Sequence, residues 1–128
     1  MDSVYYTMQD LLQVNDQLNR KDLFEAFKTQ LAKDFEQSNF DADFLKTIEP
    51  DFDLIQQKMV QELQRAEKKA DSALLQLLYR IDISESQLKK YLSEDSNQNH
   101  LMTIAELIIK RVLQKVVIRH YYKKNKNA

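Results

Sequence analysis

The chain has 128 residues and a net charge of −1, and it contains neither glycine nor cysteine. Glycine is the usual residue of tight β-hairpins, phosphate-binding loops and helix C-caps, so its absence excludes the ordinary forms of these elements and favours an all-α protein. The absence of cysteine excludes disulfides and thiolate chemistry, and the length suits a single helical domain, predicted over residues 1–122.

Two helices are predicted in the first third of the chain, over about residues 3–18 and 22–37. The second helix ends at the polar pair Ser38-Asn39. It carries an apolar stripe at helical spacing, which consists of Phe24, Phe27, Leu31 and Phe35. All six phenylalanines of the chain lie between residues 24 and 52. We interpret them as core residues rather than as the lining of a ligand pocket.

A longer apolar series begins at Pro50, a residue that suits the first turn of a helix. Apolar residues then recur at steps of three and four up to Ile81, close to the heptad seam of packed helices. An unbroken helix over residues 50–80 would be about 46 Å long, whereas a compact domain of this size is about 36 Å across. The segment is therefore predicted to break near residue 71, or else to project and be shared with a second subunit.

The last helix is predicted over about residues 100–122, after a helix that begins at Ser84. Its apolar residues come in adjacent pairs four positions apart, which gives the helix a wide buried face. Together with the long middle segment, this wide face predicts a homodimer. The expected architecture is an irregular bundle of five to six helices, followed by a disordered basic tail at residues 123–128.

Residues 72–93 resemble a degenerate helix-turn-helix, with Lys89 and Lys90 on its second helix. The segment departs from that motif at two positions. Leu78 stands where a small residue lets the two helices cross closely, and Asp82 stands where glycine usually makes the turn. A plain capped helical pair is therefore the preferred interpretation, with a DNA-binding motif as the alternative.

Charge is distributed unevenly along the chain. Residues 1–63 hold 13 acidic and 6 basic side chains, whereas the chain from residue 110 onward holds seven basic side chains and no acidic one. We predict that the acidic half covers the basic half within the bundle; the alternative is that the basic end contacts nucleic acid. The candidate anion or nucleic-acid contacts are Lys89, Lys90, Lys110, Arg111, Lys115, Arg119 and Lys123.

No group of residues predicts catalysis, a metal site or a cofactor. His100 and His120 lie at opposite ends of the last predicted helix, about 30 Å apart, and so cannot share a metal ion within one chain. An acidic cluster begins at Asp41, but Leu45 and Lys46 occupy the positions where a calcium loop requires an oxygen ligand and a glycine. We therefore predict a protein that is not an enzyme and that has neither a cofactor nor a metal ion.

These patterns predict a non-enzymatic helical interaction or regulatory module, which binds a partner protein or a second copy of itself. The alternative is a nucleic-acid-binding protein that uses residues 72–93 and the basic last helix. The sequence begins without a basic, apolar leader and contains no run of 18 apolar residues. A cytoplasmic location without membrane contact is predicted on these grounds.

Overall fold

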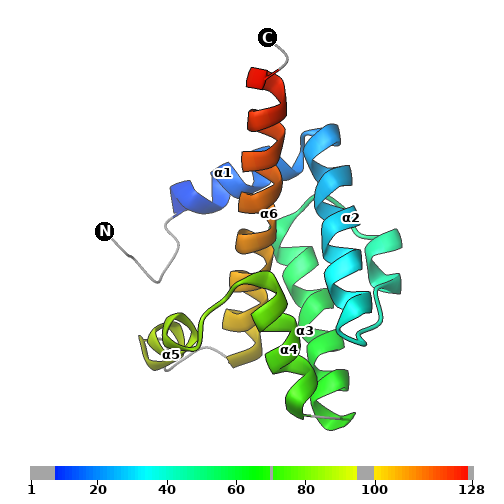
Figure 1. The fold of residues 1–128 in the computed structure, drawn as a ribbon, viewed down its shortest axis with the longest axis vertical. Coiled ribbons are helices and arrows are strands. Elements are labelled where there is room, and N and C mark those ends of the chain that lie inside the picture. Colours follow the sequence, from blue (N-terminus) through cyan, green and yellow to red (C-terminus); the bar gives the residue numbers. More distant parts are fainter. Residues whose placement is uncertain (1–7, 70, 95–99, 127–128) are drawn as a thin grey trace.

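The computed structural model describes residues 8–69, 71–94 and 100–126, and every regular element within them is helical (Figure 1). The elements are α1 (Met8–Leu18), α2 (Lys21–Gln37), the 3-10 turn η1 (Asp43–Lys46), α3 (Phe52–Lys69), α4 (Asp71–Ile81), α5 (Glu85–Glu94) and α6 (His100–Lys126). The prediction of an all-α bundle with a long C-terminal helix is confirmed. Helix α6 runs through the middle of the bundle and packs against α2, α3, α4 and α5.

The long middle segment breaks where the sequence predicted. Helix α3 ends at Lys69 and α4 begins at Asp71, and the two helices fold back on each other and pack together (Figure 1). The apolar seam therefore points into the core from both arms, with Ile55, Leu63 and Leu77 fully buried. Because α3 and α4 fold back on each other, the apolar seam is buried within one chain and needs no second subunit to cover it. One of the two reasons for predicting a homodimer is thereby removed.

The wide apolar face of α6 is also covered within the chain. Ile108, Ile109 and Val112 are completely buried, and their neighbours Leu113 and Val116 are buried as well. Four other helices pack around α6, so this width reflects a central position in the bundle rather than an interface with a second subunit. The second reason for predicting a homodimer is removed in the same way.

Helix α6 ends at Lys126, four residues beyond the end that the sequence predicted. Residues 123–126 are therefore helical and not a separate tail, because lysine is a good helix former and the segment contains neither glycine nor proline. Residues 127 and 128 lie outside the described residues. Within the described part of the chain, no helix is long and apolar enough to cross a membrane.

The core is one continuous cluster to which α1, α2, α3, α4 and α6 contribute buried residues, while the half-buried Leu88 of α5 packs against it. It begins at Val14 of α1 and reaches Leu113 of α6. The buried phenylalanines are Phe24, Phe27, Phe35, Phe40 and Phe52, and the half-buried Phe44 packs against the same cluster. The interpretation of these residues as core is confirmed.

Polar side chains cap the start of α3. The Asp51 Oδ1 atom accepts a hydrogen bond from the Leu54 N–H at 3.1 Å, as an N-cap does. The Asn15 Oδ1 atom, on α1, accepts a second one from the Phe52 N–H at 2.9 Å. Pro50 therefore precedes the N-cap. The prediction that Pro50 occupies the first helical turn is wrong.

Two helices end without glycine in a conformation that glycine usually supplies. Asn39, after α2, has a φ of 66°, and Asp82, after α4, has a φ of 70°. The residue that follows each of them, Phe40 or Ile83, donates its N–H to the carbonyl five positions earlier, at 2.8 and 2.9 Å. This is the Schellman arrangement of a helix C-terminus. Asparagine and aspartate are the residues other than glycine that enter the left-handed region most readily.

We expect Asn39→Gly to stabilise the protein by about 0.5 to 1 kcal/mol, because glycine adopts this φ without the Cβ strain. Asn39→Ala should lower the free energy of unfolding by about 1 kcal/mol, because alanine tolerates a positive φ poorly. Urea denaturation of the two variants and the wild type measures both changes. A glycine variant less stable than the wild type would contradict this account of the cap.

Candidate functional site

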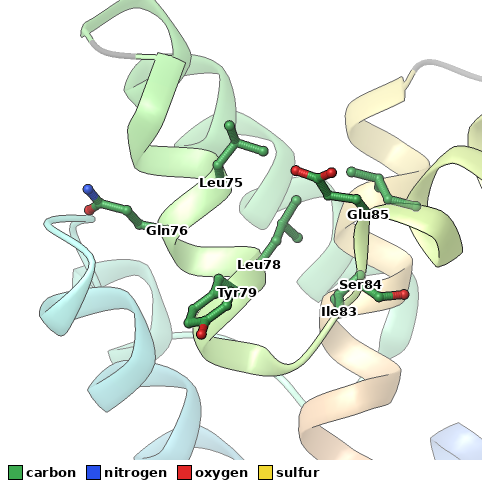
Figure 2. A pocket seen from close by; sticks show the side chains of 8 residues that line it. Leu75, Gln76, Leu78, Tyr79, Ile83, Ser84 and Glu85 are labelled. Atoms are coloured by element: carbon green, nitrogen blue, oxygen red, sulfur yellow. The ribbon is translucent and has the colours of Figure 1, made fainter.

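An apolar groove of about 550 Å³ opens between α4 and α5 (Figure 2). Leu78 and Ile83 line it and are themselves buried, whereas Leu75 is 55% exposed and Tyr79 is 85% exposed. Figure 2 shows Leu75 and Leu78 pointing from α4 toward α5, with Glu85 facing them from the first turn of α5. The groove therefore presents large apolar side chains to solvent in a concave surface.

A polar cleft of about 610 Å³ lies beside this groove, where α2, α4 and α6 meet. Gln76 and Tyr79 line both hollows, so the groove and the cleft are contiguous. The other side chains that line the cleft are Gln30, Asp34, Gln37, Ser38, Arg80, Asp82, Lys115 and Arg119. Three of these residues are cationic and two are anionic, so the cleft carries a surplus of positive charge.

The most buried charged group of the cleft is Asp34, which is only 4% exposed. Its Oδ1 atom lies 3.3 Å from the Arg80 Nε atom and accepts a hydrogen bond from the Gln30 Nε2 atom at 3.2 Å. A buried carboxylate costs free energy unless a cation and hydrogen-bond donors compensate it. The ion pair therefore fixes α4 against α2 at the base of the cleft.

Lys115 and Arg119 of α6 line the cleft, and Arg111 lies one turn before Lys115 on the same helix. The Lys115 Nζ atom lies 3.2 Å from the Asp82 Oδ2 atom, and the Arg111 Nη2 atom lies 3.9 Å from the same oxygen. Arg119 donates a hydrogen bond from its Nη2 atom to the Gln30 Oε1 atom at 2.8 Å. Asp82 thus serves both as the C-cap of α4 and as the carboxylate that anchors two side chains of α6.

The basic residues predicted from the sequence lie in different places. Lys89 and Lys90 are exposed on α5, at the end of the molecule opposite the C-terminal end of α6 (Figure 1). Arg111, Lys115, Arg119 and Lys123 recur every four residues and form one stripe along α6. The structure therefore brings the α6 residues together and leaves the two lysines of α5 apart from them.

Lys110 does not belong to the basic stripe. The side chain is half-buried, and its ammonium nitrogen is inaccessible to solvent. Burial lowers the pKa of Lys110 from 10.5 to about 7. The expectation of a solvated lysine at this position is wrong, because the helices packed around α6 leave few of its positions open to water.

Lys110 makes the stability of the fold depend on pH. Between pH 7 and 10.5 the unfolded chain retains a Lys110 proton that the folded chain has released, so the wild type should become more stable as the pH rises. We expect Lys110→Met to flatten this rise and to stabilise the protein at pH 6 by about 1 kcal/mol, a discounted figure because the side chain as a whole is only partly buried. Urea denaturation from pH 6 to 9.5 measures the effect, and identical pH profiles would contradict it.

Among the described residues, the acidic half of the chain contacts the basic stripe through the neutral Gln30, which binds Arg119, and its ion pair with α6 involves His120 instead. Near the end of α6, the His120 Nε2 atom lies 3.2 Å from the Asp22 Oδ2 atom and 3.3 Å from the Arg20 Nη2 atom. Desolvation acts to raise the pKa of Asp22, but the Leu23 N–H and the charges of Arg20 and His120 outweigh it and lower this pKa below 3.8. Among the described side chains of α6, none after His120 contacts a carboxylate.

The helical pair at residues 72–93 has an open geometry. In a helix-turn-helix the two helices pack directly on each other, whereas here the groove lies between α4 and α5, and α5 packs on α6. Leu78, which is larger than the residue the motif requires, lines the groove.

Sequence reasoning missed Leu75 and Tyr79, the two exposed residues of the groove. Both lie off the apolar seam that contains Leu77 and Ile81, and they are four positions apart. Residues spaced by four share a face of a helix. A second apolar stripe on α4 was therefore visible in the sequence as the signal of an additional surface.

No group of three His, Cys, Asp or Glu side chains within residues 8–69, 71–94 and 100–126 is placed to hold a metal ion. Comparisons of the chain with protein families, with curated proteins and with solved structures found no match. The function must therefore be argued from the surface of this molecule alone.

Proposed function

We propose that this protein is a non-enzymatic interaction module that binds an amphipathic α-helix of a partner protein. The groove between α4 and α5 is the observation that supports the proposal, because Leu75 and Tyr79 stand exposed beside the buried Leu78 and Ile83. In helix-in-groove recognition, apolar side chains spaced by three or four residues on the partner fill such a hollow.

The neighbouring cleft defines the charge of the partner. Arg80, Lys115 and Arg119 outnumber the carboxylates of Asp34 and Asp82 there, so the cleft favours acidic side chains. A helix that carries apolar residues for the groove and acidic residues for the cleft satisfies both surfaces. Tyrosine and arginine are also the residue types that most often dominate binding energy at interfaces.

The test compares tagged forms of the whole chain in a lysate of the native host, followed by binding measurements with the purified partner. Leu75→Ser/Tyr79→Ser should lose a partner that the wild type and a control, Tyr121→Ser/Tyr122→Ser, both retain. With the purified partner, the groove variant should raise Kd at least tenfold, the size of effect expected for a central anchor. A partner that binds the groove variant as tightly as the wild type would contradict the proposal.

A second copy of the chain is the other occupant that the sequence predicted for an apolar surface. Sedimentation velocity separates the two cases. If the wild type is a dimer and Leu75→Ser/Tyr79→Ser dissociates it, the occupant of the groove is a second copy of the chain and not a different protein. A monomer of 15.2 kDa at high micromolar concentration would leave the groove open to a different protein.

A further inference from the structure

The C-terminal end of α6 projects beyond the helices that cover the rest of it (Figure 1). Three large side chains there are exposed: Ile118 by 52%, Tyr121 by 64% and Tyr122 by 74%. Lys123 is exposed beside them. We call these four residues the C-terminal patch. None of them lines the groove or the cleft, so the proposed function does not account for them.

Helical geometry arranges the patch as an aromatic face with cations beside it. At 100° per residue, Ile118, Tyr121 and Tyr122 fall within about 100° of one another. Arg119 and Lys123 are four positions apart and follow on one side of this face. The patch therefore combines two exposed aromatic rings with a row of positive charge.

Charge complementarity points to a polyanion as the occupant. No acidic residue follows Glu106 in the chain, and the last turns of α6 also contain Lys124 and Lys126. Closely spaced phosphates attract such a cluster and release their counterions when it binds.

The two tyrosines decide which polyanion fits best. Unpaired bases stack on exposed aromatic rings for about 1 to 3 kcal/mol per base, whereas the bases of a duplex are already stacked on each other. Binding to a lipid surface requires a substantial aliphatic area, and Ile118 is the only exposed aliphatic side chain of the patch. The observations therefore favour a single strand over both a duplex and a membrane.

We propose that the C-terminal patch binds single-stranded nucleic acid. Lys123 and the neighbouring cations of α6 contact the phosphates, and two unpaired bases stack on Tyr121 and Tyr122. The patch itself is separate from the groove, and Arg119 is the one described cation of this site that also lines the cleft proposed for the partner protein.

The experiment measures the fluorescence anisotropy of a labelled 20-nucleotide oligothymidylate titrated with the whole protein at 50 to 300 mM salt. If Arg119, Lys123, Lys124 and Lys126 each neutralise one phosphate, log Kd should rise with log salt with a slope of about 3. Tyr121→Ala/Tyr122→Ala should raise Kd at least tenfold while leaving this slope unchanged. Lys123→Gln/Lys124→Gln/Lys126→Gln should reduce the slope to about 1.

The matched control is Lys89→Gln/Lys90→Gln, which removes two exposed lysines of α5 and should leave Kd unchanged. Circular dichroism confirms that each variant is folded. Absence of binding by the wild type at 50 mM salt would overturn the proposal, as would an unchanged Kd of the tyrosine variant. Tighter binding to a duplex of the same length would also overturn it. So would tyrosine-dependent binding to phosphatidylglycerol vesicles without binding to the oligonucleotide, which would assign the patch to a lipid surface.

Discussion

Leu77→Asp is expected to leave the chain without a stable folded state. Leu77 is completely buried on α4 and belongs to the core cluster. Removal of a buried leucine side chain costs about 2 to 5 kcal/mol, and an unpaired carboxylate in its place adds the cost of desolvating a charge. Together these terms approach the whole stability of a typical domain, about 5 to 15 kcal/mol. Circular dichroism should show reduced helicity and no cooperative thermal transition.

Leu75→Asp is the matched control for this prediction. It introduces the same side chain two positions earlier on the same helix, but at a residue that is largely exposed in the groove. Its stability should stay within about 0.5 kcal/mol of that of the wild type, as is usual for surface changes. A folded Leu77→Asp protein of normal stability would mean that α4 presents a different face to the core.

Arg80→Met is expected to lower the free energy of unfolding by about 2 to 3 kcal/mol. It leaves the buried carboxylate of Asp34 with Gln30 as its remaining partner in the cleft, and a buried charge that loses its counterion is strongly destabilising. Breaking a fully buried ion pair usually costs about 3 to 5 kcal/mol. The expected cost here is at or below the lower end of that range, because the Arg80 side chain is 38% exposed and water can enter when it is removed. Urea denaturation measures the loss.

A double-mutant cycle separates the ion pair from other effects of these substitutions. Asp34→Asn removes the carboxylate charge, so Arg80→Met should cost at least 1 kcal/mol less in that background than in the wild type. Arg20→Met is the control, because it breaks the exposed pair with Asp22, and an exposed pair contributes little to stability, so this change should cost far less than Arg80→Met. Additive costs for Asp34→Asn and Arg80→Met would rule out a coupling between the two residues.

The helices and several of their ends could be predicted from the sequence because local residue patterns determine them. The spacing of apolar residues located the core faces of α2, α3, α4 and α6. The polar residues Asn39 and Asp71 marked where helices stop or start, and the structure places a C-cap and a break there. Pro50 misled the prediction because the N-cap, Asp51, follows it by one residue.

The surfaces of the molecule could not be predicted in the same way because they depend on how the helices pack. The sequence groups Lys110 with the other candidate anion contacts, because only the four helices that pack around α6 bury its ammonium group. The groove exists because α5 packs against α6 and leaves Leu75 and Tyr79 of α4 uncovered. Spacing within one helix reports which residues share a face, but not which faces receive a neighbour.

The central position of α6 imposes an order on biosynthesis. Helices α2, α3, α4 and α5 all pack against the helix that the ribosome makes last among them. At about 5 to 20 residues per second, the 79 residues from Ser38 to Val116 take about 4 to 16 seconds to add. During this time the apolar face of α2 lacks its main partner. The apolar face of α2 therefore stays without this cover over that interval, and the core closes only after translation of α6.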